Sequence, residues 1–211
     1  MSKVRVHISV SADGYVAGPN QTPEEPLGEG GEQLHEWAIS LAQWRKSHGR
    51  EGGEVNLSTA VLEDAQANVG AEIMGRGKFG GGPGPWPEEP WNGWWGDDPP
   101  FHFPVFVLTS HAREPLTLSD TTFTFVTDGI EAALEQARAA AGEKDVTIGG
   151  GAKTINQYLS AGLVDELELH VAPVVLGGGA RLFDGVGPDL RLEQLRAVDA
   201  PGVTHLKYRV G

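Results

Sequence analysis

The sequence of 211 residues contains no cysteine. A disulfide framework, a zinc–thiolate site and a thiol nucleophile are therefore excluded. Positive charge is also scarce, because 16 lysines and arginines stand against 29 aspartates and glutamates and leave a formal net charge of -13. A chain this acidic, with no basic cluster, is repelled by nucleic-acid phosphates and by anionic lipids. We therefore expect neither nucleic acid nor a membrane as a partner.

Long apolar runs are missing as well. Residues 1–10 alternate polar and apolar side chains instead of forming the core of a signal peptide, and no later run is long enough to cross a bilayer. We therefore predict a cytoplasmic protein. The length favours a single domain over residues 1–211, with an insertion rich in tryptophan, proline and glycine at about residues 80–104.

Two kinds of catalytic motif are absent too. Lys153 lacks the preceding glycine of a Walker A motif, and no G-x-S-x-G elbow is present. The seven histidines are not paired with carboxylates at metal-ligand spacing, so no metal site is predicted. Hydrolysis and phosphoryl transfer therefore have no visible machinery in this sequence.

The three consecutive glycines at residues 149–151 are the strongest positive signal. The segment Val146–Ile148 before them predicts a strand, and the amphipathic run Ile155–Leu159 after them predicts a helix that stops at Gly162. Glycines at such a junction let a ligand approach the backbone, and the free N–H groups and positive dipole end of the helix favour a phosphate. Lys153 would add a positive charge there. A tight connection without a ligand is the alternative.

The order of apolar patterns predicts the fold class. Strands alternate with helices along most of the chain, and a hairpin around Pro201-Gly202 closes it. This order predicts a three-layer α/β fold with a mostly parallel central sheet flanked by helices and with antiparallel strands at the C-terminus. Strands are expected at residues 4–10, 71–74, 104–108, 123–126, 146–148 and 167–171. Helices are expected at 34 to about 49, from the cap Ser58 to Gly70, at 129–141 and from 155 to Gly162.

In such sheets the ligand lies beyond the carboxyl ends of the strands. Four segments follow predicted strands and are expected on that rim, namely Asp13-Gly14, Gly75-Arg76, Thr109-Ser110 and residues 149–154. Arg76, with Lys78 two residues later, is a second local concentration of positive charge. A solvated surface pair is the alternative for these two side chains.

One segment has the residue spacing of a dinucleotide-binding fingerprint but not the helix that should follow it. Gly75, Gly77 and Gly80 have G-x-G-x-x-G spacing, but glycines and prolines follow where a helix should open. The insertion then concentrates four of the six tryptophans within ten residues. An exposed aromatic loop of that density would promote aggregation, so it must pack on another surface. A lid over a flat substrate, with Trp86 and Trp94 in its wall, and a subunit contact both remain open.

Six short runs stand out by their order along the chain: Ser11–Gly14, Glu72–Arg76, Thr109-Ser110, Thr147–Gly151, Leu163–Leu167 and Ala172–Phe183. The middle runs resemble the motifs of dihydrofolate reductase. The last two look more specifically like the reductase domain at the C-terminal end of bifunctional riboflavin-biosynthesis deaminase-reductases, and the first fits the same group. The resemblance covers nearly the whole chain, but the deaminase half with its zinc-binding motif is missing.

The resemblance implies a dihydrofolate reductase-like fold and an NADPH-dependent reductase. The small-molecule substrate would be pyrimidine- or pteridine-like, as in reductases of 5-amino-6-(5-phosphoribosylamino)uracil, and the protein would be a homodimer. The resemblance implies Gly75 and Arg76 at the 2′-phosphate, and Thr109 and Ser110 at the adenosine. It implies Ala17 and Gly18 near the nicotinamide. The pyrophosphate would be held by Gly149, Gly150, Gly151, Ala152, Lys153 and Thr154.

The catalytic acid is the least defined part. The riboflavin-pathway reductases usually carry a glutamate just before their glycine pair, where this chain has Ile148, as the folate enzymes do. Hydride transfer needs an acid for the accompanying proton. Asp13 is the candidate, although loop capping explains it equally well. Glu32 and Glu36 are nearby candidates on the substrate side, and Glu36 is the one we assign there. Dihydrofolate reduction and an NADP(H)-binding protein without turnover are the alternatives.

Overall fold

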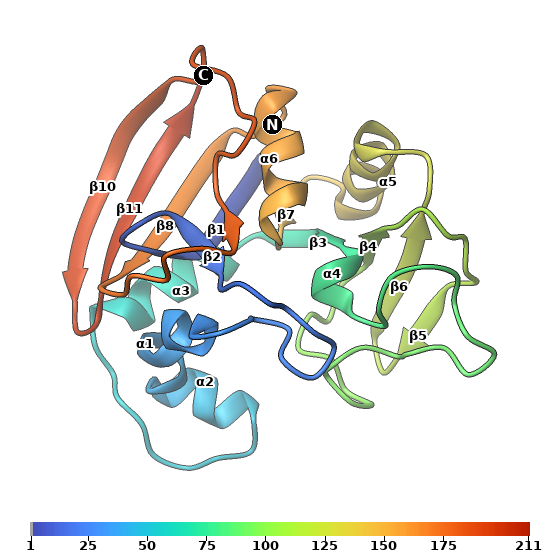
Figure 1. The fold of residues 1–211 in the computed structure, drawn as a ribbon, viewed down its shortest axis with the longest axis horizontal. Helices are drawn as coiled ribbons and strands as arrows, with labels where there is room; N and C mark the ends of the chain where they lie inside the picture. The colour runs from blue at the N-terminus through green and yellow to red at the C-terminus, as the bar shows by residue number, and fades with distance from the viewer. Residues whose placement is uncertain (1) are drawn as a thin grey trace.

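The computed structural model describes residues 2–211, and its centre is a single nine-stranded sheet (Figure 1). The order of the strands brings segments that are far apart in the sequence side by side. From one edge to the other the strands are β10 (Leu192–Ala200), β11 (Val203–Val210), β8 (Glu166–Ala172), β1 (Val4–Ser11), β7 (Asp145–Ile148), β3 (Val69–Gly75), β4 (Val105–Leu108), β6 (Thr121–Val126) and β5 (Leu116–Leu118).

The six neighbouring strands from β8 to β6 run parallel, and antiparallel pairs lie at the two edges. The predicted mostly parallel sheet with C-terminal antiparallel strands is therefore confirmed. β10 and β11 form the predicted hairpin, in which Gly202 of the turn has a φ of 73° that favours glycine. The sequence did not predict β5, because three residues are too few to show an alternating pattern.

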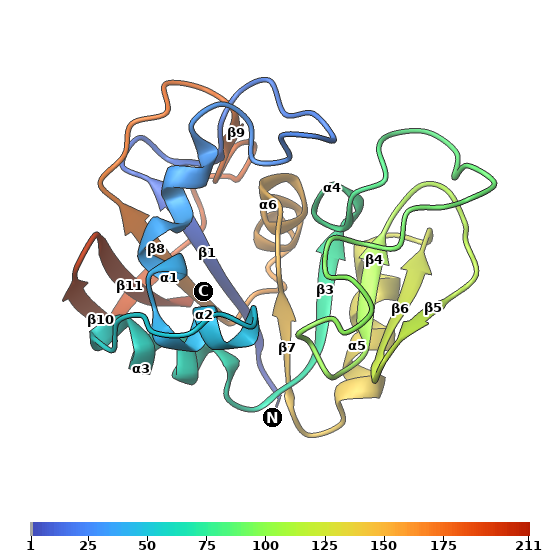
Figure 2. The same ribbon diagram turned by 90° about the horizontal axis from the view of Figure 1, so that it is seen from below.

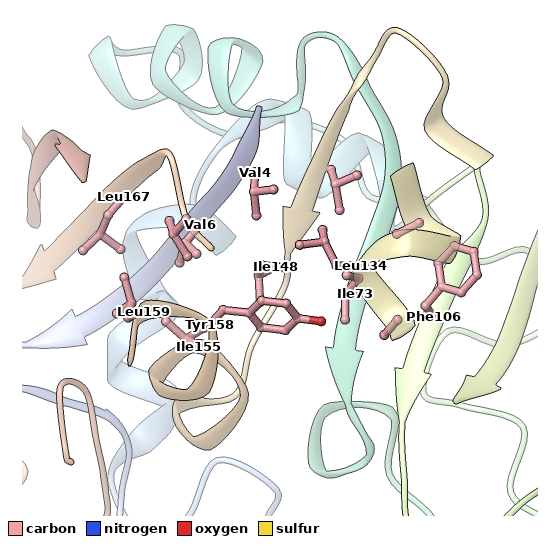
Figure 3. Packing of buried hydrophobic residues seen from close by; sticks show 14 of the residues in the cluster. Val4, Val6, Ile73, Phe106, Leu134, Ile148, Ile155, Tyr158, Leu159 and Leu167 are labelled. Atoms are coloured by element: carbon pink, nitrogen blue, oxygen red, sulfur yellow. The ribbon is translucent and has the colours of Figure 1, made fainter. Parts of the chain in front are cut away.

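One face of the sheet carries the main core. Valine and isoleucine side chains of β1, β3 and β7 pack there under α5 (Ile130–Ala141) and α6 (Ala152–Ser160). Figure 3 shows Tyr158 of α6 within this cluster. Its hydroxyl donates a hydrogen bond to the carbonyl oxygen of Ile130 at 2.7 Å, which satisfies the polar end of a ring that is otherwise buried.

The opposite face is polar. The side chains of β1 that alternate with its core residues are Arg5, His7, Ser9 and Ser11. This face is covered by the 3₁₀ helix η1 (Gly31–His35), α1 (Glu36–Ile39) and α3 (Leu57–Gln66), and Arg5 donates to carbonyl oxygens in and just after α3. Figure 1 shows α5 and α6 above the sheet and α1 and α3 below it, so the three layers are as predicted.

The predicted helix over residues 34–49 is wrong. The chain forms η1, α1 and α2 (Ala42–Ser47) instead, because Leu41 is extended, with a ψ of 141°. Residues on either side of Leu41 bond to Glu54, whose N–H donates to Ser40 and whose carbonyl accepts from Ala42. The cap of α3 is also corrected, since Asn56 accepts from the N–H of Ser58.

Two short elements complete the fold. The strands β2 (Tyr15–Ala17) and β9 (Ala180–Arg181) pair and tie the loop after β1 to the end of the 172–183 run. A four-residue helix, α4 (Arg76–Phe79), opens directly after β3, where the sequence predicted no helix. Figure 2 shows the 80–104 insertion looping out on the β5–β6 side. None of the helices in the described part of the chain is both long and apolar enough to span a bilayer.

Candidate active site

The glycine bend and the start of α4 are joined on the rim of the sheet. β7 lies between β1 and β3 and runs parallel to both, so the carboxyl ends of all three meet there. The N–H of Gly149 donates to the carbonyl oxygen of Ile73 at 2.8 Å, and that of Gly75 donates to Gly150 at 2.9 Å. The structure therefore brings together two of the segments that the sequence placed on one rim.

Close contacts explain why glycine stands at two of these positions. A Cβ on Gly149 would lie 2.0 Å from Oε1 of Glu72 and 2.5 Å from Nζ of Lys78. These two side chains form an ion pair of 2.7 Å, with Glu72 almost completely buried. A Cβ on Gly75 would lie 2.4 Å from Oγ1 of Thr154. A Cβ on Gly151, by contrast, would meet nothing within 4 Å, so packing inside the chain does not require glycine there.

The start of α6 is open to an anion. Gly151 is the N-cap and is exposed, and no side chain caps the helix. The carbonyl of Gly151 accepts from Thr154 and Ile155, whereas the N–H groups of Ala152 and Lys153 belong to the first turn, which has no partners inside a helix. The Lys153 side chain is exposed. The backbone N–H groups and the positive dipole end of α6 therefore lie beside an exposed lysine, a combination that suits an anion.

Arg76 supplies a second group that suits an anion. Its guanidinium carbon lies 3.7 Å from the ring centroid of Trp86, and Nη1 donates to the carbonyl oxygen of Gly84. Nε and Nη2 are buried and have no hydrogen-bond partner within residues 2–211. Burial lowers the pKa of Arg76 from its ordinary value. Burial is also the larger cause that lowers the pKa of Arg113, and the positive charge of Arg76 is the second. Buried donors without an acceptor are costly, and a phosphate would satisfy them.

Trp86 links Arg76 to the turn that contains Thr109 and Ser110. The indole N–H of Trp86 donates to the carbonyl oxygen of His111 at 2.9 Å. Thr109 begins the same turn, since its N–H donates to Val126 and its Oγ1 accepts from the N–H of His111. The predicted 2′-phosphate and adenosine residues are therefore neighbours in the fold.

The predicted substrate wall is not brought together. Trp86 packs against Phe79 and Phe125, on the side of α4 where Arg76 lies. The indole N–H of Trp94 donates to the carbonyl oxygen of Lys78. Glu36 is exposed on α1, across the rim from the insertion in both views (Figures 1 and 2). We therefore correct the grouping. Trp86 lies against Arg76, and no hydrogen bond links Glu36 to either tryptophan within residues 2–211.

Asp13 is an anchor for a loop. Its carboxylate accepts from the hydroxyl of Ser11 at 2.6 Å and from the N–H groups of Leu176 and Gly177 at 3.1 and 2.7 Å. The bond from Ser11, followed by those from the two N–H groups, lowers the pKa of Asp13 to about 2. An ionised carboxylate with three donors cannot supply a proton at neutral pH. Of the two interpretations of the sequence, the structure favours loop capping.

Ala17 and Gly18 lie in a tightly packed loop. A Cβ on Gly18 would lie 2.0 Å from the carbonyl oxygen of Glu29, and one on Gly179 would lie 2.2 Å from that of Ala17. The N–H of Gly18 donates to Leu27 at 2.8 Å. The close approach of three backbone segments fixes the path of this loop beside β1, where the sequence expected the nicotinamide.

Two polar groups near the rim were not identified from the sequence. One is the ion pair between buried Glu72 and half-buried Lys78. The other is a set of histidines on the polar face, in which His170 and His205 share a hydrogen bond. Lys78 lowers the pKa of both His7 and His35, although burial is the larger cause in each. The available signal was alternation, which puts His7 and His170 on the polar side of predicted strands.

One exposed cluster has the chemistry of a weak cation site. Asp98, His102 and Asp120 each offer an atom within 4.8 Å of the others. His102 and Asp120 already form a hydrogen bond of 2.7 Å, which raises the pKa of His102. The arrangement is explained as a surface ion pair and is far from the rim in sequence and in fold.

The strand order, the glycine bend at the carboxyl edge and the antiparallel C-terminal strands define a dihydrofolate reductase-like α/β fold. Within that class the relationship is specific. Residues 2–205 match the RibD C-terminal domain family, and the chain belongs to that family. Membership supports a reductase-like function.

Solved structures share the fold. A candidate riboflavin biosynthesis protein from Shewanella sp. PV-4 has a TM-score of 0.66 and 22% identity, over 99% of both chains. Dihydrofolate reductase from Enterococcus faecalis, complexed with NADP(H), has a TM-score of 0.55 and 13% identity, over 99% of this chain and 96% of that one. The uncharacterized protein YyaP of Bacillus subtilis (strain 168) is 33% identical over 90 residues, which are 42% of this chain and 47% of YyaP. The chain thus spans about half of that relative.

Proposed function

We propose that the protein is an NADPH-dependent reductase acting on a C=N or C=O bond of a small, flat, pyrimidine- or pteridine-like compound. The single observation that carries the proposal is the pair of buried donors on Arg76 that have no partner within residues 2–211. Gly75, the residue before Arg76, donates a hydrogen bond to Gly150 of the glycine bend. An acidic protein gains nothing from such donors unless an anion reaches them.

The residues fit a dinucleotide with a 2′-phosphate. Arg76 would take the 2′-phosphate, Thr109 and Ser110 the adenosine, and the segment from Gly149 to Thr154 the pyrophosphate. Ala17 and Gly18 would lie near the nicotinamide. When bound, NADPH supplies the hydride. The chain would contribute the N–H groups of the glycine bend, which β3 and β7 hold in place, and the positive charges of Arg76 and Lys153, which would orient the nucleotide.

Family membership supports the substrate class. Reductases of 5-amino-6-(5-phosphoribosylamino)uracil act on a flat pyrimidine, and the run from Ala172 to Phe183 resembles theirs. The fold shared with a dihydrofolate reductase that binds NADP(H) supports the cofactor, and it keeps dihydrofolate as a second substrate to be tried. We further propose that residues 1–211 form one domain and that the protein acts in the cytoplasm. We also propose that it is a homodimer, and analytical ultracentrifugation would test this oligomeric state.

The experiment is a titration followed by an assay. Because Arg76 stacks on Trp86, NADPH should change tryptophan fluorescence saturably, and the change should be weaker in Arg76→Met. NADPH oxidation is then followed with the phosphoribosylaminouracil and with dihydrofolate. Turnover of either supports the proposal. Tight NADPH binding without oxidation of any flat heterocycle would favour a binding protein, and absence of NADPH binding would remove the cofactor assignment.

A further inference from the structure

A chain of buried polar groups crosses the polar face of the sheet. His170 on β8 and His205 on β11 share a hydrogen bond between their Nδ1 atoms at 2.8 Å. On the far side, Nε2 of His205 is 2.9 Å from the hydroxyl of Ser58, near the start of α3. All three residues are at most 2% exposed, so the two hydrogen bonds are inside the protein.

The chain ends in an unused nitrogen. Nε2 of His170 is buried and has no hydrogen-bond partner within residues 2–211. Trp37 packs on both imidazoles with ring centroids at 5.0 Å, but its own N–H is directed to Leu34 and Ser9. A buried imidazole nitrogen without a partner is costly, and it needs either water or a ligand.

The unused nitrogen lies near the carboxyl rim. His170 is two residues from the end of β8 and is in register with Ser9 of β1, the strand next to β7 and its glycine bend. The ring of His7 lies 6.0 Å away, edge on. Its surroundings are therefore imidazole and indole rings on the side of the sheet opposite α6. Rings of this kind can stack on a flat heterocycle whose edge forms a hydrogen bond with Nε2.

We propose that His170 Nε2 binds and protonates the heteroatom of the bond that is reduced, with His205 and Ser58 as the positioning residues that resupply its proton. This inference rests on the proposed reductase function and deepens it. It also replaces Asp13, whose carboxylate is held by three donors in a loop.

The proton movement balances. The substrate carbon gains a hydride from NADPH, which becomes NADP⁺, and the heteroatom gains the Nε2 proton of His170. His170 gains a proton at Nδ1 from His205, and His205 gains one at Nε2 from the Ser58 hydroxyl. Ser58 is only 1% exposed, so it takes its replacement proton from a water molecule that enters beside it. The relay avoids an imidazolate, because each ring gains a proton at one nitrogen as it loses one at the other.

The charge state of the rings suits this relay. Burial is the main cause that lowers the pKa of His170 well below its ordinary value, and it lowers the pKa of His205 to about 4. The neighbouring imidazoles of His7, His205 and His35, and the guanidinium of Arg196, further disfavour a charged His170. Both rings are therefore neutral at physiological pH, and a neutral ring donates only if its other nitrogen is resupplied.

The first test needs no variant. Protein labelled with ¹⁵N is titrated with NADP⁺, and then with 5-amino-6-(5-phosphoribosylamino)uracil or dihydrofolate. We expect NADP⁺ to move the amide signals of Gly149–Gly151, and one of the two heterocycles to move the Nε2 signal of His170. Silent glycine amides would contradict the proposed cofactor site. Responsive amides with an Nε2 signal that neither heterocycle moves would overturn the role of His170 alone.

The second test separates proton delivery from packing. In His205→Phe and Ser58→Ala, single-turnover hydride transfer to whichever heterocycle is reduced should fall by about tenfold or more, with NADPH affinity unchanged. The solvent deuterium isotope effect should also change, which a loss of packing would not cause. The control is His48→Asn, because His48 is exposed at the C-terminal end of α2. Unchanged rates and isotope effects in both variants would overturn the relay.

Discussion

The backbone N–H of Gly75 donates to the carbonyl oxygen of Gly150 at 2.9 Å. This bond joins the two segments on which the cofactor assignment depends, because Arg76 follows directly on one side and Gly151 on the other. Their relative position is therefore set by β3, β7 and the sheet, before any ligand arrives. Preorganised donors of this kind lose little entropy on binding.

Gly151→Ala should separate folding from cofactor binding. A Cβ at Gly151 meets no atom within 4 Å, so the free energy of unfolding should change by less than about 0.5 kcal/mol. A nucleotide phosphate that approaches this backbone would meet the new methyl group, and NADPH affinity should fall about tenfold. Calorimetric titration and urea unfolding measure the two quantities. Gly187→Ala, also at an open glycine, is the control. Unchanged affinity for Gly151→Ala would count against a phosphate at the bend.

Gly149→Ala should damage the fold itself. The new Cβ would lie 2.0 Å from the buried carboxylate of Glu72, which is paired with Lys78 and has little freedom to move. We expect a loss of about 1–3 kcal/mol in the free energy of unfolding, as for overpacking of a core. Glu72→Ala removes the obstructing carboxylate. In that background, Gly149→Ala should lower the free energy of unfolding by less than it does in the wild type. If the losses of stability caused by the two substitutions simply add, the ion pair is not what excludes a side chain at position 149.

Asp13→Asn should loosen the loop without changing the proton donor. The neutral amide accepts more weakly from Ser11, Leu176 and Gly177, so the melting temperature should fall. The pH at which the single-turnover rate is half maximal should stay the same, because a carboxyl with a pKa of about 2 is already ionised. Loss of an acidic limb from that profile would restore Asp13 as a catalytic group.

The buried histidines should make stability fall in mild acid. The pKa values of His7 and His205 are lowered to about 4, mainly by burial, whereas an unfolded histidine has a pKa near 6.5. Between these values the unfolded chain binds more protons than the folded one. Stability is therefore full above pH 6.5, and each such ring weakens it by about 1.4 kcal/mol per pH unit down to about pH 4.

Urea unfolding across that window measures the effect. His205→Asn should show a shallower dependence on pH than the wild type, and His48→Asn, which changes an exposed ring, should not. Equal slopes for all three proteins would mean that His205 charges in the folded state.

Local patterns predicted most of the strands, and non-local contacts decided the rest. Alternation predicted β1 and β8, because each of these strands buries one face on the main core. The turn residues Pro201-Gly202 predicted the hairpin, although β10 is mostly exposed. The helix predicted over 34–49 failed because its apolar spacing says nothing of Glu54, whose backbone holds Leu41 in an extended conformation. Sequence periodicity cannot show a break imposed from outside the helix.

The candidate site was predictable where it follows strands. The rim residues Arg76 and Gly149–Gly151 come directly after β3 and β7, so topology alone brings them together. The packing of Trp86 against Arg76 was not predictable, because the insertion has no regular hydrophobic pattern from which the direction of a side chain could be inferred. The contact between His170 and His205 depends on the register of β8 with β11, which no local pattern specifies.

Titration of NADPH and NADH into the wild type and Arg76→Met tests the central claim most directly. Arg50→Met is the matched control, since Arg50 also lies over a tryptophan, Trp44, but on the exposed α2 side. The wild type and the control should bind NADPH at least about tenfold more tightly than NADH, and Arg76→Met should lose that preference. Equal affinity of the wild type for the two nucleotides, or binding of neither, would contradict the account.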